Sequence, residues 1–225
     1  MTALDPIARR HVALPGLRLL TRVEDGELLH SLLWKVGDGW RMISSAVLGG
    51  GIGERRWILN AQVGHGYRRV DPDRHLADLA RLAGVDGPGV GLMTAADVRA
   101  YGSAHDGGVE AVATAGLGVR GWAASPAEST VTAPRAGTIN IVAAIPVPLT
   151  DAALVNAVAT ATEAKVQALL DAGLDCSGTP TDAVCVAAPS PRADEEVHAF
   201  AGPRSLWGAR LARAVHDAVR SAADR

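Results

Sequence analysis

The feature that most constrains the fold is a series of short apolar runs in the first third of the chain, separated by glycine-containing turns. Runs at residues 17–23, 28–36 and 40–48 are joined by Asp25-Gly26 and by a Gly-Asp-Gly turn at 37–39. Asp-Gly pairs favour tight hairpin turns, because these turns need residues with positive φ angles. The pattern therefore predicts an N-terminal antiparallel meander of strands.

Beyond residue 57, expected strands alternate with expected helices. The strands are predicted at 57–63, 109–115, 138–145 and 181–188, the helices at 71–83, 94–101, 151–173 and 204–222, and a surface loop at 123–136. This order predicts a mixed α/β (α+β layered) fold, in which the meander is followed by alternating strands and helices around one sheet core. The length of 225 residues and the hydrophobic content of 48% fit a single domain spanning residues 1–225.

The charge of the chain is nearly balanced, with 22 Lys and Arg against 24 Asp and Glu. Without a large positive field, neither nucleic acid nor a membrane surface is an expected partner. No apolar run reaches the roughly 20 residues that a membrane-spanning helix needs, so a cytoplasmic location is expected. The two cysteines, Cys176 and Cys185, fit buried thiols in a reducing compartment. Assembly into a homo-oligomer is left open.

The glycine cluster at residues 49–53 invites comparison with loops that bind phosphates. A phosphate loop of the Walker type needs Lys and then Ser or Thr after its last glycine, but Glu54 and Arg55 follow Gly53 here. A tight turn or a close backbone approach is the preferred interpretation. The chain also lacks HExxH, paired Cys-His spacings and GxSxG, so neither a dedicated metal site nor a serine-hydrolase elbow is expected.

Short polar side chains recur beside glycines at the expected strand ends, where such groups can converge on a ligand. They are Ser44, Ser45, Asn60, Thr94, Thr114, Thr138, Asn140, Thr179, Thr181 and Asp182. For any single one of them, a turn or a helix cap is the competing explanation. His65 lies between two glycines and is followed closely by Tyr67, whose ring is expected to stack on a flat ligand.

One position in the expected helix at 151–173 stands out. At 3.6 residues per turn, Lys165 lies within the apolar stripe of this helix, whereas Glu163 lies on the opposite side. A lysine that faces a core needs a carboxylate partner, and Asp182 is the candidate. The alternative is that the Lys165 stem covers the stripe and its ammonium group reaches water.

Taken in order, several segments resemble the adenosylcobinamide amidohydrolase family, which salvages corrinoids, and the likeness covers most of the chain. The segments are Ser44-Ser45-Ala46 with Gly49-Gly50-Gly51, Ile58-Leu59-Asn60, Gly91-Leu92-Met93-Thr94-Ala95-Ala96-Asp97-Val98, Thr114-Ala115-Gly116, Gly137-Thr138-Ile139-Asn140-Ile141, Ala161-Thr162-Glu163-Ala164-Lys165, Gly178-Thr179-Pro180-Thr181-Asp182-Ala183 and Ala201-Gly202. The resemblance implies a corrinoid substrate and hydrolysis of the amide between its aminopropanol arm and the corrin ring, giving adenosylcobyric acid. Cobalt then enters only as part of the substrate, and no separate cofactor is expected.

Amide hydrolysis needs an attacking oxygen, donors for the oxyanion and an acid for the leaving amine. In the preferred assignment Thr138 or a water attacks, and Asn140 with backbone amides near Gly137 stabilises the oxyanion. Lys165, Glu163 and Asp182 handle charge and protons. The expected substrate-binding residues are Ser45, Gly50, Gly51, Asn60, His65, Tyr67, Thr94, Asp97, Thr114, Thr179 and Thr181, with Trp57 or Trp122 as further candidates to cover the corrin faces.

Two other functions compete with this assignment. Cleavage of the chain before Thr138 would create an N-terminal threonine nucleophile, as in some amidases and acyltransferases. Alternatively, a corrinoid-binding protein would keep the pocket and lack the chemistry.

Overall fold

The structure, a computed structural model, describes residues 14–126 and 137–224, so the loop predicted at 123–136 lies mostly outside the described residues. One sheet has the order β1-β2-β5-β6, with β1 at Arg18–Glu24, β2 at Glu27–Lys35, β5 at Trp57–Gln62 and β6 at Val90–Thr94. The other has the order β4-β3-β10-β9-β8-β7, with β4 at Gly51–Glu54, β3 at Trp40–Ser44, β10 at Ala183–Pro189, β9 at Thr138–Ala144, β8 at Val109–Gly116 and β7 at Gly102–Asp106. The helices are α1 at Pro72–Leu82, α2 at Asp151–Asp171 and α3 at Leu206–Ala223, with a short 3₁₀ helix, η1, at Val98–Ala100.

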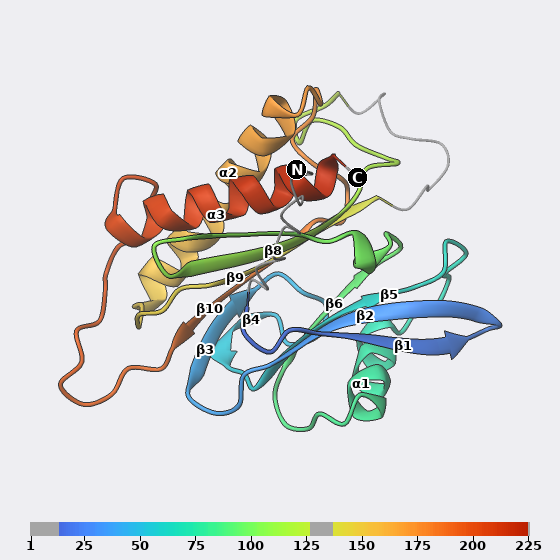
Figure 1. Cartoon of the computed structure of the whole chain (residues 1–225), viewed down its shortest axis with the longest axis horizontal. Coiled ribbons are helices and arrows are strands. Elements are labelled where there is room, and N and C mark those ends of the chain that lie inside the picture. Colours follow the sequence, from blue (N-terminus) through green and yellow to red (C-terminus); the bar gives the residue numbers. More distant parts are fainter. Residues whose placement is uncertain (1–13, 127–136, 225) are drawn as a thin grey trace, which may run out of the picture.

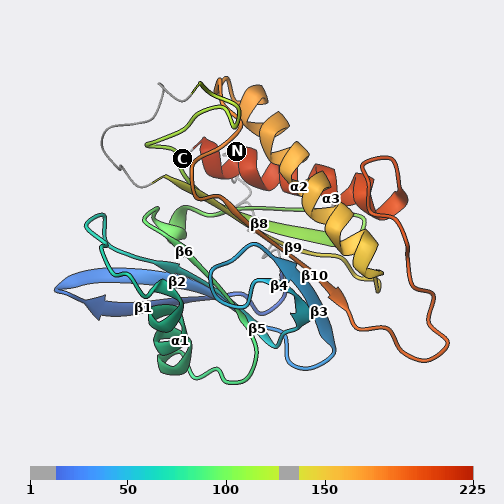
Figure 2. The ribbon, with the colours of Figure 1, turned by 180° about the vertical axis from the view of Figure 1, so that it is seen from behind.

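These elements form four layers, which Figures 1 and 2 show from opposite sides. Helices α2 and α3 cover one face of the six-stranded sheet, the four-stranded sheet packs on its other face, and α1 lies outside the four-stranded sheet. Strand β9 shows how one strand serves two layers. Ile139 and Ile141 pack toward the helices, whereas Val142 packs toward the other sheet. Successive side chains point to opposite faces of a strand, so a central strand is buried along its whole length.

Two strand–helix–strand units meet at one edge of these layers. Strands β5 and β6 are parallel neighbours joined through α1, and β9 and β10 are parallel neighbours joined through α2. The end of β6 lies close to the beginning of β9, because the Asn140 side-chain amide donates to the Met93 carbonyl at 3.0 Å. This junction brings together residues that are distant in sequence.

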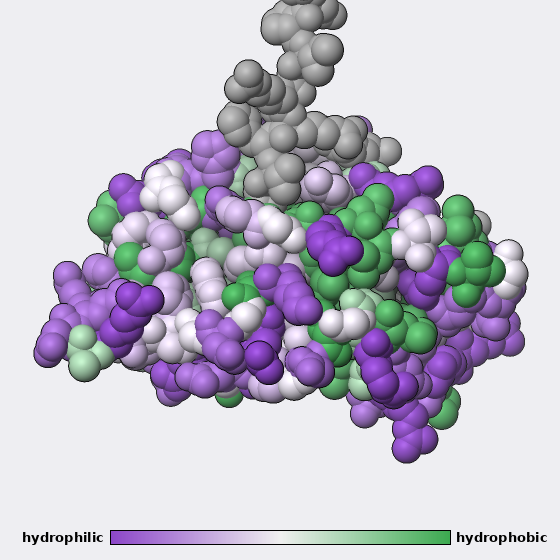
Figure 3. Space-filling model, turned by 60° about the horizontal axis from the view of Figure 1, so that its bottom comes forward, coloured by the Kyte–Doolittle hydropathy of each residue, from purple (hydrophilic) through white to green (hydrophobic). Residues whose placement is uncertain are grey.

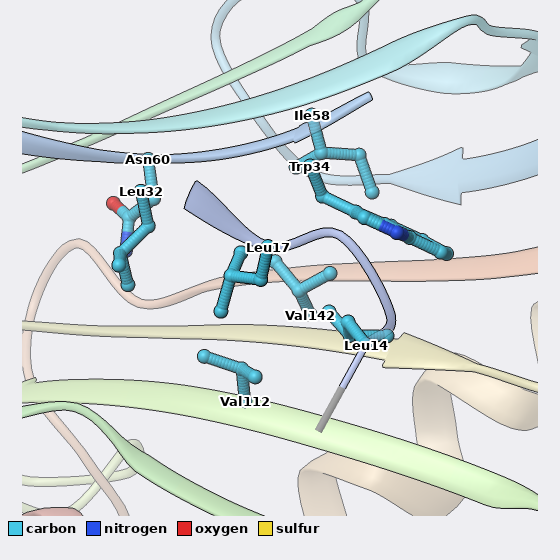
Figure 4. A pocket seen from close by; sticks show the side chains of 8 residues that line it. All are labelled: Leu14, Leu17, Leu32, Trp34, Ile58, Asn60, Val112 and Val142. Atoms are coloured by element: carbon cyan, nitrogen blue, oxygen red, sulfur yellow. The ribbon is translucent and has the colours of Figure 1, made fainter. Parts of the chain in front are cut away.

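A small gap of about 10 Å³ lies between the two sheets, with room for about one water molecule. Figure 4 shows the side chains around it. Its lining residues, drawn from both sheets and from the segment before β1, are Leu14, Leu17, Leu32, Trp34, Ile58, Asn60, Val112 and Val142. Asn60 is the polar exception in an otherwise apolar contact.

The surface shown in Figure 3 mixes hydrophilic and hydrophobic residues, with apolar patches interrupted by polar ones. Leu19, Val23 and Leu28, on β1 and β2, are among the exposed large apolar side chains. Among the described residues, no helix combines the length and the apolar character needed to cross a membrane.

The predicted mixed α/β class is confirmed, and several local features follow the sequence closely. Asp25 and Gly26 have φ angles of 51° and 81° and turn β1 into β2. The Thr150 hydroxyl caps α2 by accepting from the Ala153 amide at 3.2 Å. Gly84, with a φ angle of 71°, follows α1. Hairpin and capping chemistry is local, so it can be predicted from a few neighbouring residues.

The prediction of one sheet core is wrong, because the structure has two sheets. The meander ends after β2, since β3 pairs with β10 and β4 instead of β2. Gly37 and Gly39, both with positive φ angles, carry the chain from one sheet into the other. A two-residue periodicity marks a strand but does not identify its partner strand.

The predicted helix at 94–101 is also wrong. The segment contains the last residue of β6, a cap and the short η1. Strands β4, β6 and β7 were not predicted from the sequence pattern. Asp97 begins η1 by accepting from the Arg99 amide at 3.0 Å. A capping aspartate occurs before either kind of helix, so it does not fix the length of the helix that it starts.

Candidate active site

An open cleft of about 630 Å³ lies where the two strand–helix–strand units meet. Its walls come from the residues after β3, the loop between β5 and α1, the end of β6, and the starts of β9 and β10. The predicted site residues in its lining are Ser45, His65, Tyr67, Thr94, Thr138, Asn140, Thr181 and Asp182. The structure therefore brings together polar residues from five separate segments.

Two hydrogen-bond networks contribute residues to the lining of this cleft. The first, here called the threonine–aspartate cluster, consists of Thr138, Thr179, Thr181, Asp182 and Lys165. At its centre, the Asp182 carboxylate accepts from the backbone amides of Ile139 at 2.9 Å and Thr179 at 3.1 Å. It also binds the Lys165 ammonium group at 2.5 Å. The carboxylate thereby ties the start of β9 to the segment before β10.

Lys165 is buried and stands behind Asp182, outside the lining of the cleft. The inward lysine and its predicted partner Asp182 are thus confirmed as a contact. Because the Lys165 side chain is 9% exposed and that of Asp182 is 12% exposed, each charge depends on the other for compensation. Gly178 leaves room for the pair, since a Cβ atom there would lie 2.1 Å from Asp182 Oδ2 and 2.6 Å from Lys165 Nζ.

The hydroxyls of the cluster lie around the Gly137 carbonyl and the Asp182 carboxylate. Thr181 Oγ1 donates to the Gly137 carbonyl at 2.9 Å. Thr179 Oγ1 lies 2.8 Å from the same carbonyl oxygen and 2.5 Å from Asp182 Oδ1, and its single proton can be donated to only one of these two acceptors. Thr138 Oγ1 lies 2.6 Å from Thr181 Oγ1. If Thr181 gives its proton to Gly137, Thr138 must give its own proton to Thr181, since each hydroxyl has only one. Within residues 14–126 and 137–224, no carboxylate or imidazole is hydrogen-bonded to Thr138 Oγ1.

The second network crosses between the sheets through two buried amides. Asn140 Nδ2 donates to Asn60 Oδ1 at 2.8 Å and to the Met93 carbonyl at 3.0 Å, and Asn60 Nδ2 donates to Thr114 Oγ1 at 3.0 Å. Both Nδ2 hydrogens of Asn140 are used, and the Met93 carbonyl fixes which end of the amide faces it. Among the described residues, Asn140 Oδ1 is buried without a hydrogen-bond partner. Asn140 thus has an unused acceptor, and the predicted role as an oxyanion donor does not match this arrangement.

The sequence reasoning overlooked a polar chain that ends at the cleft. His75 on α1 is 3% exposed, and its Nε2 lies 2.9 Å from Glu24 Oε1 at the end of β1. Its Nδ1 lies 3.1 Å from the Tyr67 hydroxyl, and the two rings are stacked at an interplanar angle of 11°. Burial lowers the pKa of His75 below its ordinary value, although Glu24 opposes that shift. A histidine within an amphipathic helix gave no local signal of these partners.

Several predicted site residues lie outside the lining of the cleft. Gly50 and Gly51 form the turn into β4, where Gly49 approaches Gly89 so closely that a Cβ atom would lie 1.9 Å from its carbonyl oxygen. Asp97 is exposed and paired with Arg99 at 2.7 Å. Glu163 is exposed on α2 and, in the described part of the chain, makes no hydrogen bond or ion pair with the cluster.

The two tryptophans that were candidates to cover a corrin also lie elsewhere. Trp57 is 5% exposed and donates to the Asp86 carbonyl at 3.1 Å, as a core residue. Trp122 is 44% exposed and donates to Asp175 at 3.1 Å, outside the cleft lining. Tyr67 remains as the aromatic ring of the cleft.

Polar groups gathered at strand ends around an open cleft define an α/β protein with a small-molecule site of the kind that enzymes use. A family model described as adenosylcobinamide amidohydrolase matches residues 17–225. A protein of that name from Methanosarcina mazei is 30% identical over 184 residues, which are 79% of this chain and 87% of the relative. The chain therefore belongs to the adenosylcobinamide amidohydrolase family, as its sequence segments predicted.

The fold is shared with a more distant protein. The crystal structure of the PH0078 protein from Pyrococcus horikoshii OT3 matches with a TM-score of 0.51 and 13% identity. The match covers 92% of this chain and 83% of that chain. At this identity the likeness concerns the fold alone.

Proposed function

We propose that the chain hydrolyses the amide between the aminopropanol arm and the corrin ring of adenosylcobinamide, giving adenosylcobyric acid. Membership of the amidohydrolase family supports this reaction class. The observation that carries the proposal is the open cleft with a buried, unpartnered acceptor, Asn140 Oδ1, on one of its lining residues. A buried acceptor without a partner is costly, and the N–H of a substrate amide would satisfy it.

The attacking oxygen in the intact chain is a water. When Thr181 donates to the Gly137 carbonyl, which is not a base, Thr138 donates its own proton to Thr181. The Lys165–Asp182 pair fixes the backbone beside Thr138, because Asp182 accepts from the Ile139 amide at 2.9 Å. Thr138, Thr181 and Thr94 offer hydroxyls to the amide-rich edge of the corrin.

Self-processing before Thr138 is a second candidate, because one observation favours it. The Gly137 carbonyl, which belongs to the peptide bond that would break, accepts from Thr181 Oγ1 at 2.9 Å and has Thr179 Oγ1 within 2.8 Å. Such donors stabilise an oxyanion. Cleavage would also supply the base that Thr138 lacks in the intact chain, namely its own new amino group.

The deciding experiment incubates the full chain with adenosylcobinamide and follows the release of aminopropanol and adenosylcobyric acid by mass spectrometry. Intact-mass measurement of the same sample shows whether the chain stays at 23.2 kDa. Release of both products by an intact chain supports hydrolysis by water, whereas release by a chain cleaved before Thr138 supports the N-terminal nucleophile. Binding of the corrinoid, seen in its absorption spectrum without product release, would identify a binding protein and overturn the proposal.

Replacement of single threonines separates the two mechanisms further. Thr138→Ala abolishes turnover if Thr138 attacks, and reduces it without abolishing it if water attacks. Thr162→Ala is the matched control, because Thr162 is exposed on α2 and its hydroxyl donates to the Val158 carbonyl of the same helix. We also propose that no separate cofactor is needed, so that dialysis against a chelator leaves the turnover of the intact substrate unchanged.

A further inference from the structure

The proposed hydrolysis needs a group that takes a proton from the attacking water and gives one to the leaving amine. The threonine–aspartate cluster does not supply it, since Asp182 already accepts from two backbone amides and from Lys165. His65 lines the cleft but is exposed, and no partner orients its ring in the described part of the chain. The remaining titratable side chain in the lining that a second group orients from behind is Tyr67.

The hydrogen bonds behind Tyr67 have a defined direction. Glu24 also binds Arg22, whose Nε lies 2.8 Å from Glu24 Oε2, so Glu24 is a carboxylate that can only accept. His75 Nε2 must then carry a proton and donate it to Glu24 Oε1. The other ring nitrogen, Nδ1, is left to accept from the Tyr67 hydroxyl at 3.1 Å. The lone pairs of the Tyr67 oxygen are not used by this chain of bonds.

We infer that Tyr67, His75 and Glu24 form a proton relay in which Tyr67 is the proton-transferring group of the cleft and the other two residues position and charge-balance it. This inference rests on the proposed amide hydrolysis. Nothing in the sequence pattern assigned a role to His75 or Glu24, and stacking on the corrin was the role predicted for Tyr67.

The relay balances the reaction in two steps. As the water oxygen bonds to the amide carbon, one water proton passes to the Tyr67 oxygen and the Tyr67 proton passes to His75 Nδ1. The resulting imidazolium is stabilised by the Glu24 carboxylate. When the carbon–nitrogen bond breaks, His75 returns its proton to Tyr67, and Tyr67 protonates the leaving amine. The same arrangement of an oxygen, an imidazole and a carboxylate serves hydrolases of unrelated folds.

The charged groups around His75 keep the resting relay ready to accept a proton. On β1, Glu24 favours the imidazolium whereas Arg22 disfavours it. Beside α1, Arg69 disfavours it and Asp71 favours it, and these two residues form an ion pair at 2.8 Å. Together with burial, which is the largest influence, these groups lower the pKa of His75. Neutral His75 is the form that can accept the Tyr67 proton.

The chain contains only two tyrosines, which provides a matched pair of variants. Tyr67→Phe removes the hydroxyl and keeps the ring, and we expect kcat for adenosylcobinamide to fall by about 10²–10⁴-fold with little change in KM. Tyr101→Phe makes the same chemical change in a residue that packs against the core between the sheets. Its kcat should stay within about twofold of the unchanged enzyme, the usual limit for a residue outside the chemistry.

A second readout distinguishes the relay from a structural role. The acid limb of kcat/KM against pH should follow His75, because protonated His75 cannot accept from Tyr67. Glu24→Gln removes the charge that favours the imidazolium, so the limb should move to lower pH by about one unit or more while kcat falls. His75→Gln should remove that limb. Thermal unfolding of each variant checks that the fold is retained.

The possible results separate this inference from the proposed function. If the unchanged enzyme releases no aminopropanol, the proposed function is wrong, and the relay, which rests on it, is rejected as well. If the unchanged enzyme is active and Tyr67→Phe keeps its kcat within twofold, the relay is overturned and the hydrolysis stands. A rise in KM alone for Tyr67→Phe also overturns the relay, because it assigns the hydroxyl to binding. The relay is also overturned if the acid limb of kcat/KM against pH does not move in Glu24→Gln.

Discussion

Two of the three polar networks at the cleft, the threonine–aspartate cluster and the relay, use their hydrogen bonds differently. In the threonine–aspartate cluster, the Asp182 carboxylate and the Gly137 carbonyl bind groups of the chain itself. In the relay, the hydrogen bonds run in one direction from Tyr67, a residue of the cleft lining, through His75 to Glu24. The closed network holds the backbone in place, whereas the open one has an atom left for a ligand. The difference predicts that the first network governs stability and the second governs turnover.

The largest expected effect on stability comes from removing one charge of the closed network. Lys165→Met leaves Asp182 as a buried carboxylate without its cation, which should lower the free energy of unfolding by about 3–5 kcal/mol. Urea unfolding followed by circular dichroism measures it. Lys35 is the other lysine of the chain and is exposed, so Lys35→Met makes the same change where it should cost little. Equal losses in the two variants would show that the Lys165–Asp182 pair is not the source of the stability.

A smaller loss is expected from crowding the same network without removing any of its groups. Gly178 has a φ angle of 152°, and a Cβ atom there would collide with Asp182 and Lys165. Gly178→Ala should cost about 1–3 kcal/mol, because both the backbone and the ion pair must shift. Gly66→Ala, in a loop with open space around it and no positive φ angle, is the control. A Gly178→Ala protein as stable as the control would mean that the cluster is looser than described.

The amide pair between the sheets should show an effect of similar or slightly smaller size. Asn140→Ala leaves Asn60 Oδ1 and the Met93 carbonyl without their donor, at a cost of about 1–3 kcal/mol. Asn140→Asp should disturb the network further, since a carboxylate facing these two oxygens repels them. The midpoints of urea unfolding measure which of the two variants, Asn140→Ala or Asn140→Asp, is less stable. If Asn140→Asp were as stable as the unchanged protein, the direction assigned to the amide would be incorrect.

The smallest expected effects are the pH dependences of two histidines with opposite signs. The pKa of His75 is lowered by burial below its ordinary value of 6.5, so the unfolded chain binds more protons there and stability falls as the pH drops through about 6.5. For His216 on α3, burial alone would lower the pKa, but hydrogen bonds to Asp217 and Asp171 outweigh burial and raise it. Its contribution is therefore fully present below pH 6.5 and is lost as the pH rises through the folded pKa.

Single replacements separate the two histidines. His75→Gln should weaken the loss of stability on the acid side, and His216→Gln should cost more stability at pH 5 than at pH 8. Chemical unfolding at both pH values measures these differences. The same sign of pH dependence for both variants would contradict the pKa shifts on which the comparison rests.

The sequence was informative about the closed network, whereas of the relay it indicated only Tyr67. Lys165 faces inward because it lies within an apolar helical stripe, and Asp182 was identified as its partner from the need to compensate a buried charge. The other two members of the relay offered no such signal. Glu24 looks like a residue beside a turn, and His75 looks like one more polar residue of a surface helix. Their contact appears only when β1 and α1 pack against each other.

The features that could be predicted from the sequence alone are local or periodic: the Asp25-Gly26 hairpin, the Thr150 cap, the inward Lys165 and the family segments. Each depends on groups within a few residues or on one repeated spacing. Tertiary packing was needed to show that β3 leaves the meander to pair with β10, that the chain forms two sheets, and that Asn60 meets Asn140 between them. Strand periodicity fixes which face of a strand is buried but not which strand or sheet covers it, because the choice depends on the whole packed core.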